Sequence, residues 1–213
     1  MLNCYELNLP SLTNDTAQRL LSLAESLKVS DGFDVINFPE LNKDITKWIN
    51  FHKQTNTSKS SYIMFEMTPE FNSLIYQEMS DNLFPFSKVK FYFQLITGGD
   101  RLIPHRDPYR TISLIYNLSA DNAATHWYND ITNDPDKYFF NADEISDPIQ
   151  TIRMEPFKWY VFNNDKPHSV SEIPKNRIAI TSRINGDFGN LPTFNSFVEQ
   201  YEHLLVAENR NRT

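Results

Sequence analysis

Residues 98–107 read Gly98-Gly99-Asp100-Arg101-Leu102-Ile103-Pro104-His105-Arg106-Asp107. This stretch places an imidazole, His105, and a carboxylate, Asp107, two residues apart. In extended backbone, residues i and i+2 point to the same side, so both side chains can bind one ion. A third candidate ligand, His168, follows 61 residues after Asp107. Two histidines and one carboxylate on one face of an ion leave coordination positions open, an arrangement that suits non-haem Fe(II) oxygen chemistry.

A basic residue strengthens this interpretation. Arg177 lies nine residues after His168 and opens an apolar, strand-like run, Arg177-Ile178-Ala179-Ile180-Thr181. A guanidinium at the start of a buried strand requires an anionic partner, because an unpaired buried charge is costly. We therefore expect a metal on the two histidines and Asp107, and a dicarboxylate that bridges from it to Arg177. Taken singly, a His-x-Asp pair is more often a hydrogen-bonded pair in a loop, and a lone arginine is more often part of an ion pair. The order and spacing of His105, Asp107, His168 and Arg177 together favour the metal site.

Length and composition predict a single folded domain over residues 1–213. A chain of this length buries a substantial core, and its 40% apolar and 14% aromatic shares argue against disorder. The net charge of −7 would on average repel nucleic acid, so no such partner is expected. Cys4 is the only cysteine, which excludes an intrachain disulfide and fits a reducing interior. With no signal-like start and no long apolar stretch, we predict a cytoplasmic protein without a membrane partner.

Helices are predicted mainly in the N-terminal part. Apolar residues recur at helical spacing over 11–28 and around 40–52. A third helix begins near Thr68-Pro69-Glu70, which combines a cap residue, a proline in the first turn and an acid at the positive end of the helix dipole. A final helix is expected over 194–205.

Strands are predicted after residue 85, where short segments rich in β-branched and aromatic residues are separated by Pro, Asn, Asp and Gly. These segments are 89–96, 111–118, 125–128, 158–162 and 177–184. Helices followed by many short strands indicate an α+β domain with a sheet sandwich or barrel. We expect mainly helical support over 1–85, the β core over 86–190, and a C-terminal helix and tail over 191–213.

A long acidic insertion, residues 129–150, interrupts the strand region with five Asp and one Glu. Loops of this length often carry function or are mobile. A solvated loop is the simpler interpretation, and a lid over the substrate mouth is the alternative. Just before it, His126 alternates with Tyr128 on a short strand and either points into the barrel or is a hydrogen-bonded core histidine; we favour the second.

Over residues 89–188 the chain resembles the iron(II)- and 2-oxoglutarate-dependent oxygenases, in their prolyl-hydroxylase-like branch. The resemblance rests on a Gly-Gly pair followed by Pro104-His105-Arg106-Asp107, on the strand 113–118, on Pro167-His168-Ser169-Val170, and on 177–181. It implies a double-stranded β-helix, a jelly-roll-like barrel with supporting N-terminal helices. It also implies that His105, Asp107 and His168 bind iron, and that Arg177 binds the far carboxylate of 2-oxoglutarate.

The activity implied by the resemblance is that of a dioxygenase and hydroxylase that uses Fe(II), 2-oxoglutarate as co-substrate and molecular oxygen. The implied substrate is an amino acid or a peptidyl, prolyl-type residue, so the expected partner is a small molecule or peptide. The chain departs from the family near Leu95 and Asn117, where tyrosines are frequent; Asn117 is a candidate donor to the co-substrate in place of tyrosine. Oligomeric state is not predicted.

Arg183 is a candidate for binding the substrate. Strand alternation points it the same way as Arg177, and six rises of ~3.3 Å place it roughly 20 Å away, near the end of the barrel. The alternative is a rim arginine paired with an acidic residue of 129–150.

Two other function classes stay open. One is a cupin-like metal enzyme that does not use 2-oxoglutarate, in which Arg177 would be structural. The other is a non-catalytic β-sandwich binding module that keeps the three ligands. Iron-dependent release of carbon dioxide from 2-oxoglutarate separates the oxygenase from both.

Overall fold

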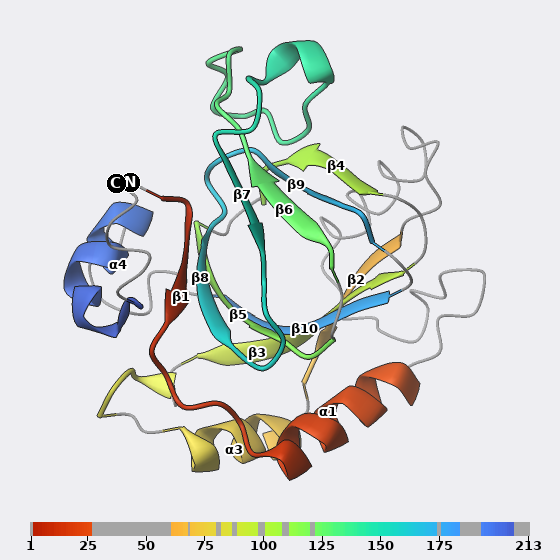
Figure 1. Ribbon diagram of the computed structural model, residues 1–213, viewed down its shortest axis with the longest axis vertical. Helices are drawn as coiled ribbons and strands as arrows, with labels where there is room; N and C mark the ends of the chain where they lie inside the picture. The colour runs from red at the N-terminus through yellow and green to blue at the C-terminus, as the bar shows by residue number, and fades with distance from the viewer. Residues whose placement is uncertain are drawn as a thin grey trace.

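The computed structural model describes residues 2–26, 61–67, 69–79, 82–86, 89–97, 101–107, 111–119, 122–173, 176–183 and 193–206. These residues form two antiparallel β-sheets that face each other as a sandwich, with helices packed on the outer side of the larger sheet (Figure 1). The sandwich predicted from the sequence is therefore confirmed. The helix predicted around 40–52 lies outside the described residues.

The larger sheet has six strands. Their order is β1 (Cys4–Leu7), β8 (Trp159–Asn163), β5 (Ile112–Asn117), β10 (Asn176–Arg183), β3 (Lys90–Thr97) and β2 (Ser61–Glu66). The smaller sheet has the order β4 (Arg101–His105), β9 (His168–Ser171), β6 (Ala124–Trp127) and β7 (Gln150–Arg153). From β3 to β10 each strand lies in the opposite sheet from the one before it, except β7, which pairs directly with β6. Neighbouring strands are therefore often far apart in the sequence.

Two apolar layers hold the sandwich together. The main core lies between the six-stranded sheet and the helices α1 (Asn14–Ser26), α3 (Pro69–Glu78) and α4 (Phe194–Gln200). Its centre is Trp159, whose ring centroid lies 4.8 Å from that of Tyr116 and 5.5 Å from that of Phe86. The second layer lies between the sheets and includes Phe162 and Trp127, with ring centroids 4.7 Å apart. Strand β8 contributes side chains to both layers, and for this reason all five of its residues are buried.

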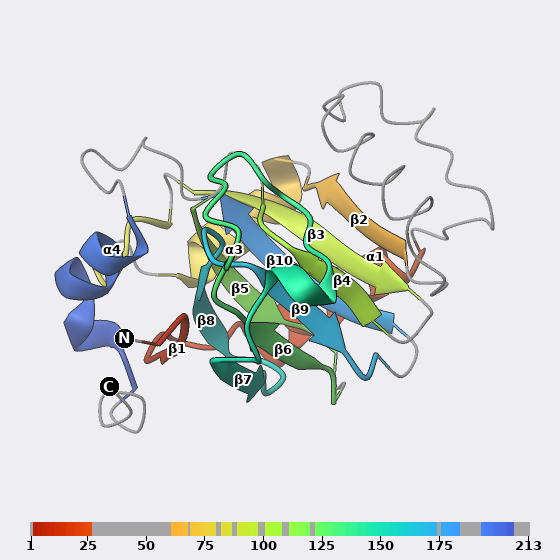
Figure 2. The same ribbon diagram turned by 90° about the horizontal axis from the view of Figure 1, so that it is seen from above.

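The helix predictions in the described part of the chain are confirmed by α1, α3 and α4, the last followed by a 3₁₀ turn, Glu202–Leu204. Glu78, on α3, accepts hydrogen bonds from the backbone nitrogen and the hydroxyl of Thr13, at 2.6 and 2.8 Å, and so joins α3 to the start of α1. Helix α4 lies beside β1 in both views (Figures 1 and 2). No helix in the described ranges is long and apolar enough to cross a membrane.

The five predicted strands correspond to β3, β5, β6, β8 and β10. The sequence did not predict β1 and β2, which extend the two edges of the larger sheet from within the part expected to be mainly helical. It also missed β4, β7 and β9. These three are short, and their alternating or polar sequences, such as Gln150-Thr151-Ile152-Arg153, lack an apolar run because one face of the smaller sheet is open to solvent.

The insertion is an ordered segment, here called the arm (residues 129–149), and it stands above β6 and β7 in Figure 1. A bridge joins Asp130 to Ile145, and the 3₁₀ turn Ala142–Glu144 starts with a reciprocal Asn141–Glu144 cap. Lys137 Nζ lies 2.5 Å from a Glu144 oxygen. Glu144 of the arm thus pairs with other residues of the same segment. The arm therefore has more internal structure than the solvated loop that we expected.

Candidate metal centre

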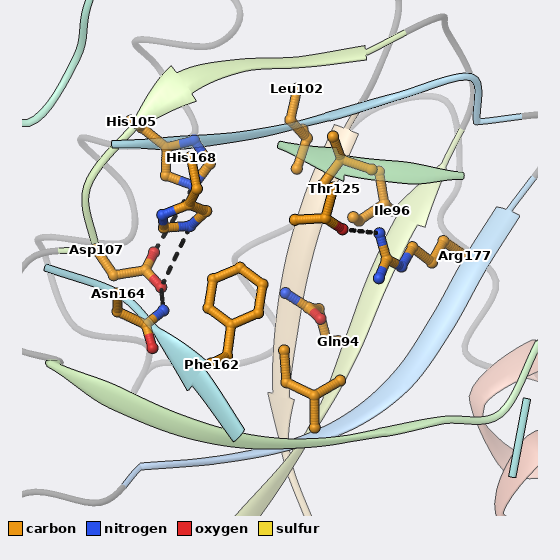
Figure 3. A pocket seen from close by; sticks show the side chains of 12 residues that line it. Gln94, Ile96, Leu102, His105, Asp107, Thr125, Phe162, Asn164, His168 and Arg177 are labelled. Carbon is orange, nitrogen blue, oxygen red and sulfur yellow. Dashed lines mark hydrogen bonds and ion pairs between the residues drawn. The ribbon is translucent and has the colours of Figure 1, made fainter. Parts of the chain in front are cut away.

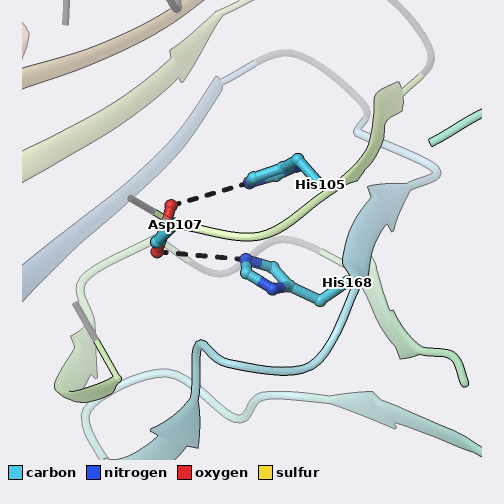
Figure 4. A group of neighbouring side chains, drawn as sticks. All are labelled: His105, Asp107 and His168. Carbon is cyan, nitrogen blue, oxygen red and sulfur yellow. Dashed lines mark ion pairs between the residues drawn. The ribbon is translucent and has the colours of Figure 1, made fainter. Parts of the chain in front are cut away.

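Two strands of the smaller sheet bring the predicted ligands together. His105 ends β4, His168 begins β9, and the two residues are paired directly across the antiparallel strands. Asp107 follows two residues after His105. One ligand atom from each of the three side chains lies within 4.8 Å of the others, and Figure 4 shows both rings directed at the carboxylate. The structure therefore brings together three residues that are separated by up to 63 positions in the chain.

Hydrogen bonds fix the orientation of both imidazoles. Nδ1 of His105 lies 2.8 Å from the carbonyl oxygen of Ile103, and Nδ1 of His168 lies 3.0 Å from that of Lys166. Because a carbonyl only accepts hydrogen bonds, each Nδ1 carries a proton, and Nε2 of the neutral ring presents its lone pair. A carbonyl on the other ring nitrogen is the usual arrangement for a metal-binding histidine.

The remaining gap suits a cation. His105 Nε2 lies 3.8 Å from Asp107 Oδ1, and His168 Nε2 lies 4.0 Å from Asp107 Oδ2, both longer than a hydrogen bond. His105 and His168 are 3% and 4% exposed. Two Nε2 atoms and a carboxylate thus converge in a buried space, where a metal ion would compensate the negative charge. The cluster could bind a metal.

Asn164 holds the carboxylate of this cluster. Its Nδ2 donates to Asp107 Oδ2, while its Oδ1 accepts a 2.7 Å hydrogen bond from the Ser113 hydroxyl. Asn164 is 1% exposed and lies next to Asp107 in Figure 3. Sequence reasoning missed this residue, because its approach to Asp107 follows from the order of the strands and has no local pattern.

Asn164→Ala is expected to weaken divalent-metal binding by roughly 10–100-fold, the usual effect of losing a hydrogen bond to a metal ligand. The carboxylate would lose the donor that fixes its rotamer. Titration calorimetry with Mn(II) measures the effect. Ser113→Ala, which leaves the Asn164–Asp107 contact in place, should have a smaller effect; wild-type affinity in Asn164→Ala would show that Asp107 needs no such support.

Arg177 lies at the other end of a shared pocket. In Figure 3 the three ligands occupy one side and Arg177 the other, with Phe162 and Gln94 between them. Arg177 is 4% exposed, and its Nη1 donates to Thr125 Oγ1 at 3.1 Å while Nη2 contacts Met154 Sδ at 3.3 Å. The apolar part of the pocket wall consists of Ile96, Leu102, Ile115, Phe162 and Val170. A buried cation thus faces the His-Asp-His cluster across a pocket whose wall is partly apolar.

Cys4 does not supply a negative charge to this end of the pocket. Burial raises the pKa of its thiol well above the usual value, and the opposing effect of the Arg177 charge is smaller. The thiol therefore stays neutral at physiological pH.

The other predicted co-substrate residue, Asn117, lies elsewhere. Its carboxamide donates to the Met154 carbonyl oxygen at 3.2 Å and accepts from the Ser119 hydroxyl at 3.4 Å, and Asn117 is not among the residues that line the pocket. Leu95 belongs to the main core, whereas its neighbour Gln94 lines the pocket. Strand alternation explains the difference, since consecutive residues face opposite sides of the sheet.

His126 and Arg183 complete the predicted residues. His126 is half-buried, with Nδ1 2.9 Å from Thr151 Oγ1 and Nε2 2.7 Å from Ser171 Oγ, so the hydrogen-bonded interpretation is confirmed, although not as a core residue. Its neighbour Thr125 lines the pocket, which places His126 on the outer face of the sheet. Arg183 ends β10 opposite Lys90, but its side chain lies outside the described part, so its role stays a prediction.

No protein-family model matches the chain, and no curated protein matches it. Solved structures with a similar arrangement include a prolyl-4-hydroxylase from Pseudomonas putida, 13% identical with a TM-score of 0.40, covering 84% of this chain and 91% of that one. They also include a vicilin from Solanum melongena (14%, TM-score 0.35, 63% of this chain) and one from Corylus avellana, hazelnut (10%, TM-score 0.32, 62% of this chain). The chain spans 31% of the length of each vicilin. With TM-scores below 0.5, the function proposed below rests on the site itself.

Proposed function

We propose that the chain is an Fe(II)- and 2-oxoglutarate-dependent dioxygenase, built as one domain on a double-stranded β-helix. The strand order supports this fold: β8-β5-β10-β3 in the larger sheet opposes β4-β9-β6-β7 in the smaller, and the chain passes between the two. The proposed substrate is an amino acid or a peptidyl, prolyl-type residue. The observation that carries the proposal is the placement of a His-Asp-His cluster and a buried arginine at opposite sides of one pocket.

Each polar residue of the pocket has a role in this proposal. His105, His168 and Asp107 would hold Fe(II), and Asn164 would keep the Asp107 carboxylate in place. When bound, the iron would supply oxygen activation coupled to oxidative decarboxylation of 2-oxoglutarate.

Arg177 would bind the distal carboxylate of 2-oxoglutarate through its planar fork, a charge-assisted contact that can be bidentate. Thr125, which accepts from Nη1 of Arg177, would orient the guanidinium. The apolar wall, including Phe162 and Val170, would exclude water from the space between the two ends.

The test is release of labelled carbon dioxide from 1-¹⁴C-2-oxoglutarate by the full chain with Fe(II), with succinate measured in parallel. We expect turnover that requires both iron and 2-oxoglutarate and that is slow when no substrate is added. The rate should rise with a proline-containing peptide or free proline if the prolyl assignment is right. His105→Ala serves as the inactive control. A chain that binds Fe(II) but releases no carbon dioxide, with or without candidate substrates, would favour a cupin-like metal enzyme or a binding module instead.

A further inference from the structure

Arg106 lies between two of the proposed metal ligands, His105 and Asp107, and connects them to the arm. Residues i and i+1 of an extended chain point to opposite sides, so its side chain leaves the strand away from the His105 ring. Its guanidinium donates to three residues of the arm: to Asp130 Oδ2 at 2.5 Å, to the Asp134 carbonyl oxygen at 3.0 Å and to the Lys137 carbonyl oxygen at 3.3 Å.

The backbone of the arm also forms hydrogen bonds with the backbone of residues 104–106, which precede Asp107. Arg106 N donates to the Tyr138 carbonyl oxygen at 2.8 Å, and Phe140 N donates to that of Pro104 at 3.0 Å. The guanidinium carbon lies 5.1 Å from the centroid of the Phe140 ring, within the range of a cation–π contact. Side-chain and backbone contacts thus hold the arm and residues 104–106 together on the same edge.

These contacts act where pairing between β4 and β9 ends. The last paired residues are His105 and His168, and the register shifts between Leu102 and His105. Asp107 therefore lies beyond the paired part of β4. The sheet holds His105, whereas the backbone that leads into Asp107 is attached to the arm.

The ion pair is sheltered and organised on both sides. The side chains of Arg106 and Asp130 are 17% and 9% exposed, so solvent screens their attraction less than that of a surface pair. The other oxygen of Asp130 accepts from the backbone nitrogen and the hydroxyl of Thr132, at 2.7 and 2.6 Å. Burial raises the pKa of the Asp130 carboxyl, but the hydrogen bonds from Thr132 and Arg106 together with the Arg106 charge outweigh this effect. The pKa of Asp130 therefore lies below its usual value. Asp130 is therefore a preformed anionic partner for Arg106.

We propose that Arg106 is a positioning residue for the metal site. The Arg106–Asp130 pair fixes the arm to the end of β4 and thereby sets the position of Asp107, so the arm is a fixed support behind the site. This inference rests on the proposed metal-binding function, because its effect is on the geometry of the three ligands.

The experiment measures Mn(II) affinity of the full chain by titration calorimetry, with the melting temperature recorded for each variant. Arg106→Gln and Asp130→Asn should each weaken Mn(II) binding by roughly tenfold or more, the scale of losing a residue that orients a metal ligand. The double variant should be about as weak as the weaker single variant, because both changes remove the same Arg106–Asp130 ion pair. Asp130→Asn is nearly isosteric and decides the matter if Arg106→Gln does not fold.

A matched control separates positioning from general stability. Arg153→Gln removes an arginine–carboxylate pair of the same sheet, Arg153 to Glu172 at 2.7 Å, and should leave Mn(II) affinity unchanged. If Arg106→Gln and Asp130→Asn bind Mn(II) as tightly as wild type and only melt at lower temperature, the contact is merely structural and the inference fails. If the wild-type chain itself binds no Mn(II), the proposed function fails and this inference with it.

Discussion

Replacing His105, Asp107 or His168 with alanine is expected to abolish stoichiometric binding of a divalent metal. Each residue supplies one of three converging ligand atoms, and two ligands alone hold an exchangeable metal poorly. The overall fold should persist, because the three residues lie at or beyond strand ends and belong to neither apolar layer of the core. Metal content after reconstitution with Mn(II), measured together with the melting temperature, checks both expectations.

His126→Ala is the matched control for these variants. His126 is a half-buried histidine of the same smaller sheet, but both of its ring nitrogens contact hydroxyl groups on the outer face. This variant should retain one metal ion per chain. The ligand assignment would be wrong if all three variants at the cluster retained the metal as well.

Arg177→Ala is expected to weaken 2-oxoglutarate binding by roughly 30-fold to several thousand-fold. Losing one partner of a buried charged pair costs about 2–5 kcal/mol, and each 1.4 kcal/mol corresponds to about a factor of ten. Metal content should be unchanged, because Arg177 lies on the opposite side of the pocket from the three ligands. The measurement is the dissociation constant of 2-oxoglutarate in the presence of saturating Mn(II).

Arg177→Lys distinguishes charge from geometry. Lysine keeps the positive charge but lacks the planar fork of arginine. The affinity of the Arg177→Lys variant for 2-oxoglutarate should therefore lie between those of wild type and the alanine variant. Unaltered 2-oxoglutarate binding in Arg177→Ala would transfer the role to another cation, and Arg183 is the next candidate.

The sequence predicted the strands that have a strong local signal. Strands β5 and β8 are buried along their whole length and therefore read as apolar runs. Strands β4 and β9 carry two of the three proposed ligands, yet they were missed, because they are short and contain polar residues or proline. The residue types and spacing of His105, Asp107 and His168 nevertheless pointed to one cluster without these strands.

The residues that hold Arg177 and Asp107 in place could not be predicted from the sequence. Thr125 contacts Arg177 across 52 positions, and Asn164 contacts Asp107 across 57, because strand order places distant segments side by side. Asn117 and Gln94 also show that the sequence alone did not identify which residue lines the pocket. The family resemblance pointed to Asn117 for the co-substrate, whereas Gln94 is the residue that lines the pocket, and its side of the strand is set by the fold.

The most direct measurement of the central claim is 2-oxoglutarate binding to the full chain with and without Mn(II), by titration calorimetry under anaerobic conditions. A dicarboxylate held both by the metal and by Arg177 should bind at one site per chain, and far more tightly when Mn(II) is present. Equal affinity with and without Mn(II), or no binding to a chain that has taken up one Mn(II), would contradict the proposal.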